Sequence, residues 1–255
     1  MTALEYLKDL PCFFINVETA TARYDQFMTV TAPLFGEVNQ VAVEETLDDG
    51  NAYAWRDMTK RTVEDNDQDL FGIETSFTAS NKHLGTNPKT RLLYARTMSV
   101  YHSHRLALAR GLRSGHERFM ILEDDAVPRV KALEWCKQPP LDSTFNIWGG
   151  ALKMGAHKTD NRAFQRAGRI QWQPIQQDPS FIRRLYCATA YELTANAADI
   201  MLEDTARHPI QFDVCWWYSM LGLGAERLVP TGFVQHGPSL RSTRINHESV
   251  TEVSE

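Results

Sequence analysis

Three consecutive carboxylates, Glu123, Asp124 and Asp125, directly follow the apolar segment 119–122, which has the length and composition of a buried strand. In an open α/β sheet, ligands bind at the carboxyl ends of the strands. Adjacent carboxylates repel one another, and a hard divalent cation removes that repulsion while phosphates complete its coordination shell. The segment therefore predicts a cation site, although an acidic triplet by itself is also typical of a solvated turn.

The elements that must position these carboxylates alternate along the chain. Apolar runs typical of strands cover residues 11–16, 39–43, 118–122, 145–148, 185–193 and 227–235. Helical patterns cover residues 20–35, 94–112, 195–206 and 214–221, with Thr194 and Asp213 as N-caps and Gly115 at a helix end. This alternation indicates an α/β protein whose mostly parallel central sheet is flanked by helices.

The length of 255 residues allows one large domain or two small ones. We expect a single domain over residues 1–246 and a polar tail over 247–255. Residues 44–90 and 151–183 are polar and irregular, and we interpret them as insertions or mobile loops.

Composition narrows the class of protein. The net charge of −5 argues against attachment to nucleic acid by bulk charge, and neither a GxGxxG sequence nor a P-loop occurs. No run of about 18 apolar residues and no secretion signal is found, so we expect no transmembrane segment. The four cysteines are scattered without a CxxC pair, which favours small buried thiols in a reducing, cytoplasmic compartment.

An ordered set of motifs adds a family resemblance. The set comprises CFFIN at 12–16, Ser103-His104 with Ala107 ahead of 118–125, Trp148-Gly149-Gly150, residues 188–202, Asp213 with Trp216-Trp217, and Val229-Pro230 with Gln235. It resembles glycosyltransferase family 25, the lipopolysaccharide-type sugar transferases, which have the GT-A fold. The resemblance covers most of the chain apart from about residues 44–90 and 151–183. The chain departs from the family after the first strand, where only Arg23 stands for an Arg-rich stretch.

The resemblance implies metal-dependent, inverting transfer of a sugar from a nucleotide-sugar donor, such as a UDP-sugar. Asp125 and Glu123 are expected to hold Mn²⁺ or Mg²⁺, which would neutralise the leaving pyrophosphate, and His236 is a third candidate ligand. Inversion needs one base to take the proton of the acceptor hydroxyl, and Asp213 is the candidate. A plain N-cap is an equal explanation for Asp213.

Further residues are candidates for binding the donor and the acceptor. Those expected to bind the donor are Phe14, Asn16, Arg23, Asp124, Gly149 and Gly150. Those expected to bind the acceptor are Trp216 and Trp217, by stacking, and Arg183 and Arg184, by contact with phosphates. Core packing for a tryptophan and a solvated charge for an arginine are the alternatives. His104 is interpreted as a packed histidine that orients the acidic loop.

The acceptor remains open between two classes. One is a surface glycan such as lipopolysaccharide, which we favour slightly, and the other is a hydroxylated cytosine base in DNA, as phage sugar transferases use. The net charge and the lack of a basic tail weaken a membrane-bound acceptor, whereas the basic segment from Lys153 to Arg184 could line a DNA groove. A metal-dependent phosphohydrolase and a sugar-binding protein without activity are alternatives of other classes.

Overall fold

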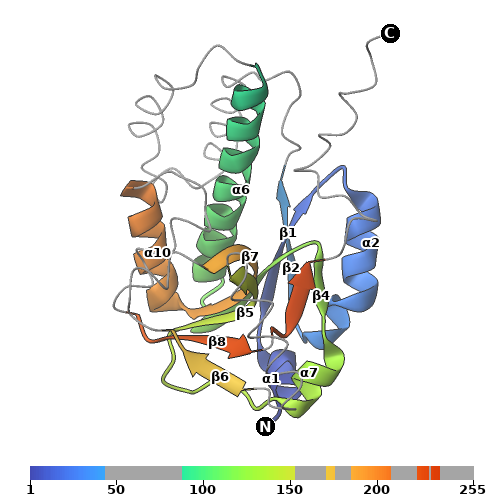
Figure 1. Cartoon of the computed structure of the whole chain (residues 1–255), viewed down its shortest axis with the longest axis vertical. Helices are drawn as coiled ribbons and strands as arrows, with labels where there is room; N and C mark the ends of the chain where they lie inside the picture. The colour runs from blue at the N-terminus through green and yellow to red at the C-terminus, as the bar shows by residue number, and fades with distance from the viewer. Residues whose placement is uncertain (44–87, 153–170, 176–184, 208–222, 230, 236–255) are drawn as a thin grey trace.

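The computed structural model describes residues 1–43, 88–152, 171–175, 185–207, 223–229 and 231–235 (Figure 1). The described strands are β1 (Cys12–Val17), β2 (Val38–Val43), β3 (Arg118–Glu123), β4 (Ala126–Pro128), β5 (Phe145–Leu152), β6 (Gln171–Pro174), β7 (Leu185–Thr194), β8 (Ala225–Val229) and β9 (Phe233–Gln235). The described helices are α1 (Ala3–Asp9), α2 (Thr21–Val30), the 3₁₀ turn η1 (Ala32–Leu34), α6 (Pro88–Arg113), α7 (Val130–Trp135) and α10 (Ala195–Arg207).

These strands form one sheet in the order β2-β1-β3-β7-β5-β8-β6, with β4 and β9 off this path. Strand β1 pairs in parallel with β2 and β3, and β5 pairs in parallel with β8 and β9. Strand β7 lies antiparallel between β3 and β5, while β6 and β4 run antiparallel to β8 and β9. The sheet is thus mixed but mostly parallel, because six of the nine described strands point the same way.

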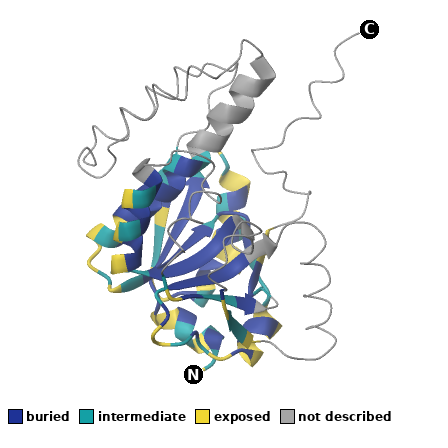
Figure 2. Ribbon diagram, turned by 60° about the vertical axis from the view of Figure 1, so that its left-hand side comes forward, coloured by how far each residue is buried: buried dark blue, intermediate teal, exposed yellow. Residues whose placement is uncertain are grey.

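Helices cover both faces of the sheet (Figure 1). Helices α6 and α10 pack on one face, over a core that includes Tyr101, Ile121 and Tyr191. Helices α1, α2 and α7 lie on the other face, over a core that includes Phe14 and Trp148. Figure 2 shows buried residues concentrated in the sheet between these two layers. Strands buried on both faces explain why their sequences read as continuous apolar runs.

The strand order reverses at β1. From β1 the chain crosses through α2 to β2 on one side, and it returns through α6 to β3 on the other side. In open α/β sheets, such a reversal leaves a crevice outside the carboxyl ends of the two diverging strands. We therefore expect a ligand site at the carboxyl ends of β1 and β3, where Asn16 and Glu123 lie.

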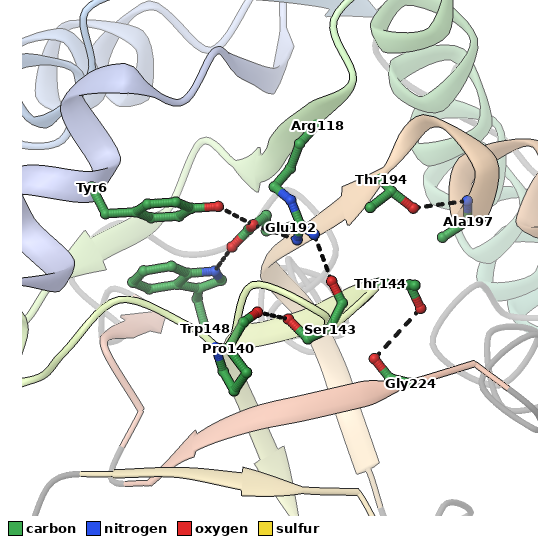
Figure 3. Close-up of polar contacts among 10 residues, drawn as sticks. All are labelled: Tyr6, Arg118, Pro140, Ser143, Thr144, Trp148, Glu192, Thr194, Ala197 and Gly224. Atoms are coloured by element: carbon green, nitrogen blue, oxygen red, sulfur yellow. Dashed lines mark hydrogen bonds and ion pairs between the residues drawn. The ribbon is translucent and has the colours of Figure 1, made fainter. Parts of the chain in front are cut away.

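A polar cluster lies away from that edge, between α1 and the sheet (Figure 3). The side chain of Glu192 in β7 is completely buried and accepts hydrogen bonds from Tyr6 of α1, Arg118 of β3 and Trp148 of β5. The Arg118 and Trp148 bonds are each 2.8 Å long. Arg118 also donates to the carbonyl of Ser143. The cluster connects one helix with three strands.

Most of the predicted helices and strands are present, and the residues predicted to begin or end two of the helices do so. The Ala197 N–H donates to the Thr194 hydroxyl at 3.2 Å, which confirms the predicted N-cap of α10. Gly115 has a φ of 77°, as expected of a residue that ends a helix. The predicted helix 20–35 divides instead into α2 and η1, with a proline in the first turn of η1. The predicted strand 227–235 is two strands, β8 and β9.

Other elements correct the sequence analysis. Strand β6 lies within residues 151–183, which were expected to be irregular, and α6 begins inside 44–90. Strand β6 has only four residues and carries polar glutamines, so it lacks an apolar run. Helices α1 and α7 and strand β4 were not predicted, because they are too short to show a period. The expected helix 214–221 lies outside the described residues.

Candidate active site

Three of the residues expected to bind the donor meet at the carboxyl ends of β1 and β3. The Asn16 side-chain amide donates to Asp124 Oδ2 at 2.8 Å, and Arg23 Nη1 lies 2.9 Å from Asp124 Oδ1. Asn16 and Asp124 are 1% and 6% exposed, so the cluster is almost closed to solvent. Asn16 comes from the end of β1, Arg23 from the first turn of α2 and Asp124 from the turn after β3. The structure therefore joins residues that are about 100 positions apart through one carboxylate.

Gln40 extends this cluster from the neighbouring strand. Its side-chain amide donates to Asn16 Oδ1 at 3.0 Å. Gln40 pairs with Phe14 in the parallel register of β1 and β2, and Phe14 precedes Asn16 on the same face of β1. Gln40 is not among the residues predicted from the sequence, and only the register of β2 against β1 could have revealed it. Together the four side chains form a polar row from β2 to the turn after β3.

The charge of Asp124 is held in an environment that opposes it. Burial raises the pKa of Asp124, and the nearby Glu123 carboxylate raises it further. The Arg23 guanidinium and the Asn16 amide act in the other direction and lower the pKa. Burial is the largest of these effects, so the pKa lies above its ordinary value. Arg23 and Asn16 therefore offset part of the effect of burial on this carboxylate.

Glu123 makes its contacts with other elements than Asp124 does. His104 Nε2 of α6 lies 3.4 Å from Glu123 Oε1, and the Gln235 amide of β9 donates to Glu123 Oε2 at 3.0 Å. Asp124 is bound by α2, whereas Glu123 is bound by α6. The two adjacent carboxylates are thus held by partners from opposite faces of the sheet. His104 is 1% exposed and contacts Glu123, as expected of a packed histidine beside the acidic loop.

Asp125, the third carboxylate, is 8% exposed and directly precedes β4. In the part of the chain that the structure describes, no three His, Cys, Asp or Glu side chains lie together in a way that could hold a metal ion. Mg²⁺ commonly uses one or two carboxylates and takes its other oxygen ligands from water and substrate phosphates. Two carboxylates, as expected of Asp125 and Glu123, would be enough for a site of that kind.

Two other residues expected to bind the donor have packing roles. Phe14 is 1% exposed and stacks on Phe27 at 4.1 Å between ring centroids, so its ring belongs to the core beneath α2. Gly149 lies where β9 crosses close to β5, because a Cβ there would be only 2.9 Å from Phe233 Cβ. Neither residue contributes to the polar row around Asp124. Gly150 lies in β5, and its surroundings are not described.

The remaining predicted site residues lie outside the described residues. They are Asp213, His236, Trp216, Trp217, Arg183 and Arg184. Their roles in catalysis, metal binding and acceptor binding therefore stay predictions. His236 directly follows Gln235 in the sequence, and Gln235 donates to Glu123.

Among the helices of the described residues, none is long and apolar enough to span a membrane. No protein-family model matches the chain, and no curated protein matches it either. The functional interpretation consequently rests on the site itself and on the motifs in the sequence.

Proposed function

We propose that this protein is a metal-dependent, inverting glycosyltransferase of the GT-A type that takes its sugar from a nucleotide-sugar donor. The observation that carries the proposal is the cluster of Asn16, Arg23 and Asp124 at the strand-order reversal, next to a turn with two more carboxylates. A crevice at such a reversal is where nucleotides bind in open α/β sheets. The resemblance of the ordered motifs to glycosyltransferase family 25 supports the same function.

The cluster is suited to a neutral, hydrogen-bonding group of the donor. Asp124 is already paired with Arg23, so its negative charge is offset within the protein. The amides of Asn16 and Gln40 are held in a row by hydrogen bonds, which fixes them before a ligand arrives. A pre-oriented polar row lowers the entropic cost of binding a polar molecule such as a nucleoside. We therefore assign the nucleoside part of the donor to this cluster.

The acidic turn is suited to the diphosphate part of the donor. Asp125 and Glu123 would hold Mn²⁺ or Mg²⁺, and the ion would neutralise the charge that develops on the leaving diphosphate. His104 and Gln235 contact Glu123 and orient its carboxylate. Asp213 is proposed as the base that takes the proton of the acceptor hydroxyl.

Slow donor hydrolysis tests this function without knowledge of the acceptor. The protein is incubated with a panel of nucleotide sugars and Mn²⁺, and release of the nucleoside diphosphate is measured. We expect release from one or a few donors, abolished by a chelator. Asp125→Asn should lower the rate by about 10²-fold or more, the scale for removing one group that stabilises developing charge. Asp9→Asn, at an exposed position at the end of α1, is the matched control and should not change the rate.

Two acceptors are then added to the active donor. Transfer to truncated lipopolysaccharide would support a surface glycan, and transfer to duplex DNA with 5-hydroxymethylcytosine would support the alternative. A metal-dependent phosphohydrolase would instead cleave nucleotides with no sugar attached. Hydrolysis of such nucleotides, or an unchanged rate in Asp125→Asn, would contradict the proposed function.

A further inference from the structure

The Glu123 carboxylate is connected to the protein interior through a histidine and a tyrosine. His104 Nε2 lies 3.4 Å from Glu123 Oε1, and His104 Nδ1 lies 3.0 Å from the Tyr191 hydroxyl. Tyr191 comes from β7 and is completely buried, with its ring stacked on Phe145. The contacts run from the middle of the sheet, through helix α6, to the edge where the acidic turn begins.

The Tyr191 hydroxyl faces Nδ1 of His104 and the Glu123 carboxylate faces Nε2, so both groups influence which nitrogen carries the proton. Burial raises the pKa of Tyr191 well above its ordinary value, and the charge of Glu123 raises it further, so the hydroxyl keeps its proton. When this hydroxyl donates to Nδ1, the proton of the neutral imidazole is on Nε2 and faces Glu123. In the other tautomer, the lone pair of Nε2 would face the carboxylate and the two would repel each other. The ionised form of Glu123 therefore favours the Nε2–H tautomer.

We propose that Tyr191 and His104 are positioning residues for the candidate active site: Tyr191 fixes the tautomer of His104, and His104 holds the Glu123 carboxylate in one orientation. This inference rests on the proposed function, because the orientation of Glu123 matters only if this edge binds a cation with a nucleoside diphosphate. Groups behind a metal ligand orient it and raise its affinity for the ion, and their loss commonly costs about 10- to 100-fold in affinity.

The first test measures the tautomer directly and does not depend on the function. The ¹⁵N chemical shifts of the His104 ring are recorded in the wild-type protein and in Tyr191→Phe. We expect a proton on Nε2 alone in the wild type. In Tyr191→Phe, the Tyr191 hydroxyl no longer donates to Nδ1, so the fraction of the Nδ1–H tautomer should rise, although Glu123 still opposes it. A wild-type ring protonated on Nδ1 alone, or identical shifts in the two proteins, would overturn the proposal.

The second test measures the binding of UDP in the presence of Mg²⁺ by calorimetry. His104→Phe removes the donor to Glu123 and should weaken binding by about 10-fold or more. His104→Gln restores an amide N–H near the position of Nε2 and should recover most of the affinity. His104→Phe alone leaves the buried Tyr191 hydroxyl without its bond to His104, which could destabilise the fold. The double variant His104→Phe, Tyr191→Phe removes both polar groups of this bond and so avoids that cost. It should bind as weakly as His104→Phe.

His116 offers a matched control, because it forms a histidine–glutamate pair on the surface. His116 Nε2 lies 3.2 Å from Glu37 Oε2, and both side chains are at least one-third exposed. His116→Phe should leave UDP binding unchanged. Wild-type affinity in a folded His104→Phe would overturn the proposal, as would failure of His104→Gln to recover any binding. If the wild-type protein binds no nucleoside diphosphate of any base, the proposed function fails, and the ¹⁵N shifts alone decide whether Tyr191 fixes His104.

Discussion

Two buried carboxylates at different places in the sheet, Glu192 and Asp124, are held in different ways. Glu192 is opposite Met120 in the pairing of β7 with β3, so the two carboxylates are separated by about four residues along the chain direction of β3, roughly 13 Å. Glu192 has no exposed surface, whereas Asp124 is 6% exposed and lies at the carboxyl ends of the strands. One carboxylate lies in the interior between α1 and the sheet, and the other lies at the carboxyl ends of β1 and β3, where the strand order reverses.

The two carboxylates also differ in the chemistry of their hydrogen-bond partners, and this difference matters more than their burial. Trp148 and Arg118 can only donate hydrogen bonds, so both oxygens of Glu192 must be acceptors. Asp124 accepts from Asn16, whose own amide oxygen accepts from Gln40. Amide groups can turn over and exchange donor with acceptor. The cluster around Glu192 thus has one arrangement of protons, whereas the amides of Asn16 and Gln40 are fixed only while the Asp124 carboxylate accepts, and they can reverse when it is replaced by an amide.

The largest effect is expected when Glu192 is changed to glutamine. One amide N–H₂ of the new side chain must then face Trp148 or Arg118, so two donors point at each other and a buried group loses its bond. We expect a loss of about 2–4 kcal/mol in the free energy of unfolding, measured by urea denaturation. A loss below about 1 kcal/mol would show that the hydrogen bonds around residue 192 can rearrange. Glu192 and Asp124 would then not differ in the way described.

Tyr6→Phe should have an intermediate effect that depends on pH. Burial, followed by the charge of Glu192, raises the pKa of Tyr6 above its ordinary value of 10.0. Above about pH 10 the unfolded chain releases this proton and the folded chain keeps it, so stability is full below that pH and falls as the pH rises. Wild-type stability should therefore fall more steeply than that of Tyr6→Phe between about pH 10 and 11, by up to about 1.4 kcal/mol per pH unit. Equal slopes for the two proteins would contradict a raised pKa of Tyr6 in the folded state.

Asp124→Asn should have the smallest effect on stability. Asn16 and Gln40 can turn their amides over and accept the new N–H₂, and the carboxylate whose ionised form burial opposes is removed. Arg23 then loses this ion pair, but the carbonyl oxygen of the new side chain remains as an acceptor. We expect a change below about 1 kcal/mol in urea denaturation, together with weaker binding of UDP and Mg²⁺ by calorimetry. Loss of stability equal to that of Glu192→Gln would make Asp124 a structural residue.

The sequence predicted those parts of the fold and site that depend on local signals. Long apolar runs identified the main strands, and Asn16 and Asp124 were predicted at the ends of two of them. The choice of partners could not be predicted in the same way. Gln40 depends on the register of β2, and Tyr191 depends on which face of α6 meets β7. Phe14, which was expected to bind the donor, lies one pair deeper than Asn16 on the same face of β1, and its ring stacks on Phe27 of α2; the sequence alone does not show which positions of the strand α2 covers.

The most direct test of the account follows signals from both clusters in one titration. UDP with Mg²⁺ is added to the ¹⁵N-labelled protein, and the spectra are compared at the Asn16 side-chain amide, the Glu123–Asp125 backbone amides and the Trp148 indole N–H. We predict that the Asn16 and acidic-turn signals shift with saturation while the Trp148 indole signal stays in place. A saturable shift at Trp148 with no change at Asn16 would contradict the account, because it would place the ligand at the Glu192 cluster.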